Sequence, residues 1–151
     1  MGAETIRRIR KLNQAYAYTA LQLHEFIGRA AGFSGTDHKY LGFLIQQGPM
    51  TAGELARLTG LTTGAVTGLI DRFEKRKLVK RQLAEGDRRK VIVVPHIDRI
   101  MTLLEPFYKD FRRRSEDLIA SFSEKELKVV ETYLTGSIEV MNTTLSEIRK
   151  K

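Results

Sequence analysis

Apolar side chains follow a helical period over most of this 151-residue chain. Spacings of three and four residues run through residues 5–31 and again through residues 97–122, and a near-heptad pattern continues to the C-terminus. These patterns predict long amphipathic helices, and the first is longer than a small globular core needs. Pro106 lies inside the second stripe, where it is expected to kink or break the helix near Glu105. The apolar positions of the three stripes are Ile6, Ile9, Leu12, Tyr16, Leu23, Phe26, Ile27 and Ala30; Ile100, Met101, Leu104, Phe107, Phe111, Leu118, Ile119 and Phe122; and Leu127, Val130, Leu134, Ile138, Met141, Leu145 and Ile148.

Shorter helices are predicted between the long ones. Asp37 is placed to cap a helix that stops at Gly48-Pro49. Thr51 and Glu54 have the spacing of a capping box, as do Ser123 and Glu126 at the start of the last helix. Thr62 is the N-cap candidate of a further helix, which follows the tight turn Thr59-Gly60-Leu61. The apolar faces of the three short helices are Tyr40, Leu41, Leu44 and Ile45; Leu55, Ala56 and Leu58; and Val66, Leu69, Ile70 and Phe73.

The period changes after these helices. Residues 79–83 and 90–94 have the pattern of two short strands around the polar segment 84–89. A helix, a tight turn, a second helix and a basic hairpin together are the order of a winged helix-turn-helix. The predicted fold is therefore mainly α with a small β-hairpin wing.

The long terminal helices suggest how the chain is organised. Residues 1–35 are predicted to form an N-terminal dimerisation helix, residues 36–95 the winged helix-turn-helix domain, and residues 96–151 the C-terminal dimerisation helices. One chain has little surface to cover the long apolar stripes, which favours an intertwined homodimer. The alternative is an all-helical monomer whose ends pack on each other.

The charge of the chain points to an anionic partner. The formal net charge is +8, and residues 62–94 hold nine Lys or Arg against four Asp or Glu, so +5 of it lies in the helix and hairpin. An α-helix fits the major groove of double-stranded DNA, and small residues near the helix N-terminus permit a close approach to the bases. The residues predicted to contact DNA are Thr62, Thr63, Gly64, Thr67, Arg72, Lys75, Arg76, Arg81, Asp87, Arg88, Arg89 and Lys90. Asp71 is more consistent with an ion pair to a nearby Lys or Arg side chain than with contacts to DNA bases.

Several other classes of protein lack support in the sequence. There is no cysteine, so disulfides and thiolate metal sites are excluded. No long apolar run predicts a membrane span, and the N-terminal residues lack the apolar core of a secretory signal, which favours a cytoplasmic protein. No phosphate-binding loop, nucleophile elbow or metal-ligand motif indicates an enzyme or a cofactor.

The central run of residues resembles the MarR family of bacterial transcriptional regulators. The resemblance rests on Leu55-Ala56, on the segment from Thr62 to Val79, which includes Val66-Thr67-Gly68-Leu69-Ile70-Asp71-Arg72-Phe73-Glu74, and on Asp87-Arg88-Arg89. It implies that Arg89 enters the minor groove or contacts phosphate and that Asp87 orients the wing. The family often has glycine where this chain has Lys77, and longer polar residues where it has Gly68.

The resemblance also implies a function. The chain is expected to be a homodimeric repressor that binds a near-palindromic operator and is released by a small aromatic or phenolic effector. Effector-binding candidates are Tyr16, His24, Arg29, Phe43 and Met101. A metal site built from His24, Asp37, His38 and His96 is not expected, because no pair of histidines has ligand spacing and cysteine is absent. The alternative function is a helical dimer whose winged domain docks a partner protein.

Overall fold

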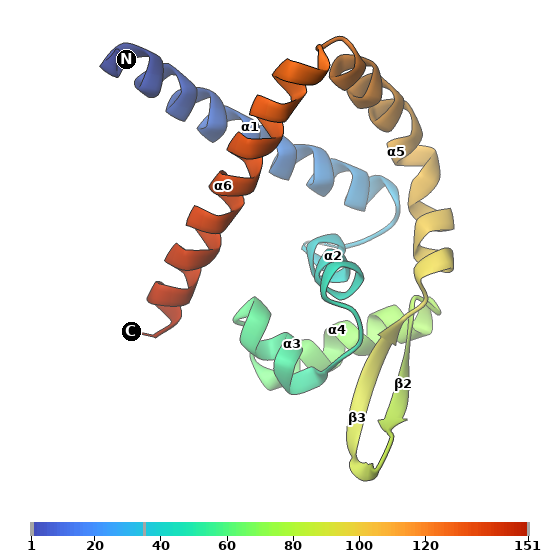
Figure 1. Ribbon diagram of the computed structural model, residues 1–151. Helices are drawn as coiled ribbons and strands as arrows, with labels where there is room; N and C mark the ends of the chain where they lie inside the picture. The colour runs from blue at the N-terminus through green and yellow to red at the C-terminus, as the bar shows by residue number, and fades with distance from the viewer. Residues whose placement is uncertain (1, 35, 151) are drawn as a thin grey trace. The chain divides into compact units, whose positions relative to one another are not determined.

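The computed structural model describes residues 2–34 and 36–150, and the elements follow one another mostly as the sequence predicts (Figure 1). They form two compact units, one up to Tyr108 and one from Lys109 onward. In order, the elements are α1 (Ala3–Ala30), α2 (Asp37–Gln47), β1 (Met50–Thr51), α3 (Ala52–Thr59), α4 (Thr63–Lys75), β2 (Val79–Ala84), β3 (Asp87–Pro95), α5 (Ile97–Ala120) and α6 (Glu124–Arg149). None of the helices in the described part of the chain is long and apolar enough to cross a bilayer.

The core of the first unit is built from the faces that the apolar periodicity identifies. Leu44, Leu55, Val66 and Ile100 are completely buried, and they come from α2, α3, α4 and the start of α5. Burial of each such side chain stabilises the fold by roughly 1.5–3 kcal/mol. The first turns of α5 therefore belong to the same core as the helix-turn-helix, and this core holds α4 at a fixed angle to α3.

The sheet has three antiparallel strands in the order β1-β3-β2, one strand more than the sequence predicts. The missed strand is β1, whose two residues pair with Val93 and Ile92 of β3. Two residues are too few to reveal a period of two, so the pattern cannot identify such a strand.

The hairpin is longer than predicted, and its turn is shorter. Strand pairing continues to Ala84 and Asp87, past an irregularity after Leu83, so the segment 84–89 is not a loop. Gly86 has a φ of 81° and makes the reversal within Glu85-Gly86. Arg88 and Arg89 consequently lie on β3 instead of in a turn.

The predicted helix caps are confirmed with one exception. The Thr51 hydroxyl accepts the Glu54 N–H at 3.1 Å while the Glu54 carboxylate accepts the Thr51 N–H at 2.8 Å, and α6 begins with the same box at Ser123. The Thr62 hydroxyl accepts the Ala65 N–H at 3.2 Å. Asp37, however, does not cap α2, because Thr36 is the N-cap residue and the buried Asp37 carboxylate binds Arg72.

Lys77 occupies a backbone position that favours glycine, with a φ of 58°. Its N–H donates to the Glu74 carbonyl at 2.8 Å, and the Leu78 N–H donates to the Phe73 carbonyl at 2.9 Å. This pair of bonds is a Schellman motif, which ends α4 and directs the chain into β2. The turn into the wing thus forms with lysine at the position of positive φ.

The long helices leave much of their apolar surface exposed. On α1, Leu12 and Phe26 are exposed, and none of the residues described on α6 is buried, Leu134 and Ile138 included. Pro106 is expected to kink or break the helix, and the chain is not broken there, since α5 continues as one helix from Ile97 to Ala120. A proline removes a single backbone donor, and the helix continues on both sides of it.

Candidate nucleic-acid interface

The N-terminal part of α4 presents a small polar surface to solvent. Val66, Leu69 and Ile70 point into the core, and Thr63 and Thr67 are exposed on another face of the helix. The Thr67 hydroxyl donates to the Thr63 carbonyl at 3.0 Å, which fixes its side chain. The open space beside Gly64 contains no atom within 4 Å of a Cβ built there, so packing within the protein does not require glycine. This surface can come close to a partner without steric conflict.

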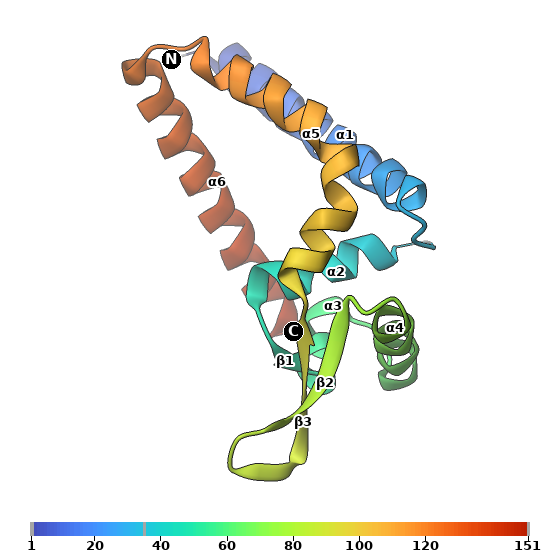
Figure 2. The same ribbon diagram turned by 90° about the vertical axis from the view of Figure 1, so that its right-hand side faces the viewer.

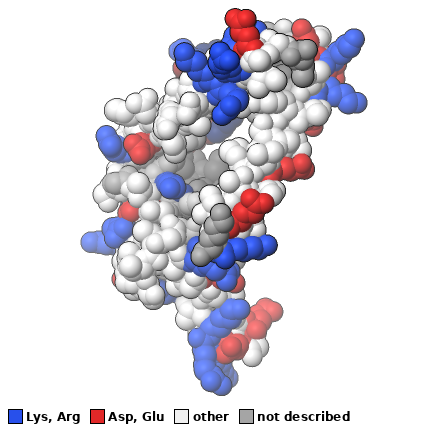
Figure 3. Space-filling view, turned by 90° about the vertical axis from the view of Figure 1, so that its left-hand side faces the viewer, with Lys and Arg blue, Asp and Glu red and all other residues white. Residues whose placement is uncertain are grey.

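The wing carries the second group of predicted residues. The β2–β3 hairpin projects beyond α3 and α4 (Figure 2), and Arg88, Arg89 and Lys90 are exposed on it. The Asp87 carboxylate accepts the Arg89 N–H at 3.0 Å and orders the start of β3. Figure 3 shows basic side chains at the tip of the hairpin with acidic ones beside them. The wing is therefore mixed in charge, and Glu85 and Asp87 reduce its positive potential.

Arg72 and Arg76 turn away from the exposed threonines and bind the end of α1 and the start of α2. Arg72 donates from Nε and Nη2 to the two oxygens of Asp37, at 2.7 and 2.9 Å. Arg76 donates to the carbonyls of Ala31 and Gly32 at 2.8 and 3.1 Å. We call Arg72, Arg76 and their three acceptor residues the arginine bracket.

Electrostatics supports a structural role for the arginine bracket. The hydrogen bond to Asp37 raises the pKa of Arg72 above its usual value, despite an opposing effect of burial. A bidentate guanidinium–carboxylate pair has a fixed orientation, which lysine cannot reproduce. Gly68 lies one turn earlier, and a Cβ built there would be 3.5 Å from Arg72 Nη1. The bracket therefore fixes the orientation of α4 relative to α1 and α2.

Arg81 forms two further ion pairs within the protein. Its guanidinium binds Asp71 at 2.5 Å and also Glu74, and its backbone N–H donates to Glu74 at 3.3 Å. The hydrogen bond to Asp71 is the largest cause of a raised pKa at Arg81. The ion pair predicted for Asp71 is confirmed, and its effect is to join β2 to α4.

Two groups of the predicted DNA contacts are exposed, and a third group is bound within the protein. Thr62, Thr63, Gly64 and Thr67 share one exposed end of α4, and Lys75 is exposed at the other end. Asp87, Arg88, Arg89 and Lys90 are on the wing, whereas Arg72, Arg76 and Arg81 are bound within the protein. Three of the nine basic residues between positions 62 and 94 thus serve the fold, and the available positive charge is smaller than the sequence suggests.

The effector candidates have different neighbours. His24 contacts Tyr108, Arg29 pairs with Glu25 on the surface of α1, and Phe43 stacks on Tyr40. Tyr16 is 75% exposed on α1, and Met101 is 44% exposed on α5. The described residues contain no cluster of three potential metal ligands.

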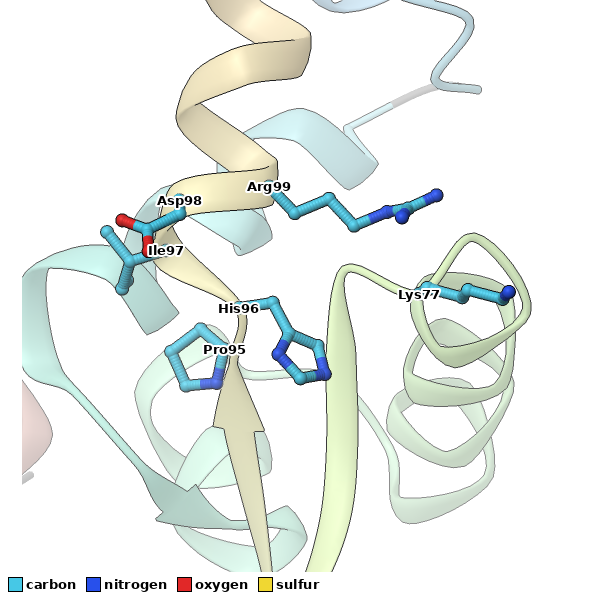
Figure 4. A pocket seen from close by; sticks show the side chains of 6 residues that line it. All are labelled: Lys77, Pro95, His96, Ile97, Asp98 and Arg99. Carbon is cyan, nitrogen blue, oxygen red and sulfur yellow. The ribbon is translucent and has the colours of Figure 1, made fainter.

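A cavity of about 510 Å³ lies where the wing joins α5. Figure 4 shows Lys77, His96 and Arg99 around it, with Pro95, Ile97 and Asp98 completing the lining. It borders the C-terminal end of α4, since Lys77 directly follows Arg76 at the helix cap. The cavity is therefore separate from the surface that begins at Thr62.

Sequence reasoning missed a contact of three side chains that are far apart in the chain. His24, His38 and Tyr108 meet from α1, α2 and α5. The separations of 84 and 70 residues leave no local signal that could have predicted this.

Comparisons with known proteins agree with this geometry. The family model described as MarR family matches residues 31–90. The uncharacterized HTH-type transcriptional regulator YcgE of Bacillus subtilis (strain 168) is 37% identical over 131 residues, which span 84% of this chain and 82% of YcgE. A MarR family protein from Bacillus stearothermophilus superposes with a TM-score of 0.71 at 25% identity, covering 94% of this chain and 99% of that one. FabT from Streptococcus pneumoniae, solved in complex with DNA, has the same fold, with a TM-score of 0.67, 20% identity and coverage of 92% and 99%.

Proposed function

Because this chain belongs to the MarR family of transcriptional regulators, we propose that it is a cytoplasmic repressor that binds a near-palindromic DNA site as a homodimer. The observation that carries the proposal is that two exposed surfaces suited to contact with DNA are held on one hydrophobic core. These are the threonine and glycine surface of α4 and the arginine-bearing wing. The DNA complex of FabT, which shares the fold, supports the same use of this architecture.

In this proposal the N-terminal end of α4 enters the major groove. Thr63 and Thr67 offer hydroxyls to base edges or phosphates, and Gly64 lets the backbone approach closely. The unpaired N–H groups at the helix start favour a phosphate nearby. Arg89 on the wing reaches the adjacent minor groove or backbone, and Lys75 and Arg88 add phosphate contacts.

The homodimer follows from the apolar surface of the terminal helices. Leu12 and Phe26 on α1, and Leu134 and Ile138 on α6, are exposed within one chain. A second copy that covers these helices would bury apolar area and stabilise the pair. Two recognition helices related by a twofold axis read half-sites about 34 Å apart.

Release by a small aromatic or phenolic effector is the last part of the proposal. An effector lowers operator affinity only if it binds a dimer with the wrong spacing of the two α4 helices more tightly than the DNA-bound form. Tyr16, His24, Arg29, Phe43 and Met101 remain the candidate contacts. In a dimer these contacts come from both copies.

The test is selection of binding sites from random double-stranded DNA, followed by fluorescence anisotropy on the selected site. The wild type is expected to bind tightly, with an affinity that falls steeply as salt is added. Arg89→Ala should weaken binding by about tenfold, which corresponds to roughly 1.4 kcal/mol. Arg10→Ala is the matched control, because it removes the same charge from an exposed position on α1 and should leave affinity within about twofold. Equal losses for the two variants, or no selected site, would contradict the proposal.

A further inference from the structure

His24, His38 and Tyr108 form a cluster where α1, α2 and α5 meet. The Tyr108 hydroxyl lies 2.5 Å from His24 Nδ1 and 3.4 Å from His38 Nε2. The two imidazole rings are stacked with centroids 6.1 Å apart, and Tyr108 packs against both at 5.7 and 6.2 Å. Two of the three histidines of the chain thus share one hydroxyl group.

The hydrogen bonding of this cluster depends on the charge of the imidazoles. A tyrosine hydroxyl has a single hydrogen, so between two neutral imidazoles it can donate to one ring nitrogen and accept from the other. When both rings are protonated, every ring nitrogen is a donor, and the hydroxyl hydrogen has no acceptor in the cluster. Two positive charges would also stand at the 6.1 Å ring separation, where they repel. The three-element contact is therefore favoured by neutral histidines and weakened when both rings are imidazolium ions, because the hydroxyl hydrogen must then turn to solvent and the two charges repel.

The packing around His38 strengthens this dependence. His38 is half-buried, and a Cβ built on Gly28 would lie only 2.7 Å from its Cβ, so the approach of α1 to α2 at this point requires glycine. Burial, and then the charge of His24, lower the pKa of His38 from its usual value of 6.5. The neutral ring is thus favoured in the folded protein. This preference stabilises the cluster above about pH 6.5 and is lost as the pH falls from there toward the lowered pKa.

Several charged groups on the neighbouring helices already have other partners. Beside it on α2, the Asp37 carboxylate is held by two hydrogen bonds from Arg72 of α4. Elsewhere around the cluster, Glu25 and Arg29 of α1 pair with each other, the Lys39 ammonium lies over Tyr40, Arg76 of α4 lies over Phe33, and Glu105 is one turn before Tyr108 on α5.

The cluster is connected to the arginine bracket through Phe33. Phe33 packs its ring against His38 at 5.9 Å and against Phe73 of α4 at 6.3 Å. The Arg76 guanidinium lies 4.2 Å from the centre of the Phe33 ring. A movement of His38 would therefore displace Phe33, and through Phe33 it would displace Arg76, which helps to orient α4.

We propose that His24, His38 and Tyr108 form a proton-responsive latch that controls DNA binding. With neutral histidines the latch joins α1, α2 and α5 and keeps the arginine bracket in the arrangement described here. Protonation of both histidines separates the helices, loosens the bracket and lowers operator affinity. The inference rests on the proposed function and adds the proton as its regulator.

The direction of the response makes the latch testable. Acidification adds positive charge to the protein, and charge alone would tighten DNA binding. We expect the opposite: between about pH 7.5 and about pH 5.5, wild-type affinity for the selected site should fall about tenfold, which corresponds to roughly 1.4 kcal/mol. Fluorescence anisotropy at constant salt measures it.

Three variants separate the latch from other effects of pH. His24→Gln combined with His38→Gln keeps side chains that donate and accept hydrogen bonds without titrating, so affinity should stay within about twofold across this pH range. Tyr108→Phe removes only the shared hydroxyl and should bring affinity at about pH 7.5 down toward the acid value. His96→Gln is the matched control, because His96 is exposed at the start of α5 and outside the cluster, and it should keep the wild-type response.

The outcomes distinguish the latch from the proposed function. Selective DNA binding that is unchanged or tighter at acid pH would overturn the latch and leave the repressor proposal intact. A pH response that disappears in His96→Gln would also overturn it. No selective binding at any pH would overturn both proposals. In the free protein, proton NMR should show the His38 ring titrating below the usual histidine pKa of 6.5, and a His38 pKa at or above that value would count against the latch.

Discussion

Arg72 on α4 donates two parallel hydrogen bonds to the carboxylate of Asp37, the first residue of α2, at 2.7 and 2.9 Å. The Asp37 side chain is 11% exposed and that of Arg72 is 53% exposed, so the pair joins a nearly buried carboxylate to a half-exposed guanidinium. Arg72 lies on the proposed recognition helix but faces the protein. Its effect on DNA binding is therefore expected to pass through the orientation of α4.

The two sides of this pair should behave as one unit. Asp37→Asn and Arg72→Lys should each lower the free energy of unfolding by about 1 kcal/mol and weaken DNA binding by several-fold, because either change removes the bidentate geometry. The double variant should lose no more stability and DNA affinity than either single variant, because both changes remove the same interaction. Urea unfolding and anisotropy measure both quantities, and Asp98→Asn, an exposed acid on α5, is the control. Tighter DNA binding by Asp37→Asn would mean that Arg72 contacts DNA directly once it is released.

Lys77→Gly should stabilise the protein. Lysine at a φ of 58° carries a steric cost of roughly 1–2 kcal/mol, part of which is offset because glycine has more freedom in the unfolded chain. We expect a net gain of about 0.5–1 kcal/mol in urea unfolding at a fixed protein concentration. Lys80→Gly, placed on β2 where an extended backbone suits any residue, should instead destabilise. A loss of stability in Lys77→Gly would show that the lysine side chain contributes more than its backbone conformation costs.

Adjacent threonines separate folding from DNA binding at the start of α4. Thr62→Ala removes the hydroxyl that accepts the Ala65 N–H and should cost about 1 kcal/mol of unfolding free energy. Thr63→Ala removes an exposed hydroxyl and should change stability by less than about 0.5 kcal/mol while weakening binding to the selected site. Thermal unfolding and anisotropy on both variants check this difference. Equal stability of the two would contradict the capping role of Thr62.

The salt dependence of binding should tell wing contacts from internal ion pairs. Arg89→Ala should reduce the slope of log affinity against log salt by about 1 for each subunit, because a phosphate contact is lost. Arg81→Ala removes an equal charge that is bound to Asp71 and Glu74, so the slope should stay the same even if the protein is less stable. Anisotropy titrations at several salt concentrations measure the slopes. A reduced slope for Arg81→Ala would place that residue on DNA.

Local signals in the sequence were sufficient for the elements and for much of the candidate interface. The capping spacings at Thr51 and Thr62 depend on atoms three residues apart, and the apolar period that buries Val66 and Phe73 is a property of one helix. Such features hold whatever surrounds the helix, so the sequence could predict them. The exposed polar end of α4 and the basic wing were predicted in the same way.

Long-range pairing was decided only by the tertiary structure. Arg72, Arg76 and Arg81 look like DNA contacts in a basic run, yet their acceptors on Asp37, Ala31 and Asp71 come from other elements or an earlier turn. The short strand β1 and the meeting of His24, His38 and Tyr108 likewise need chain segments that only folding brings together. A sequence carries periodicity along one element, whereas the choice of partner for a charge or a ring depends on distances across the whole fold.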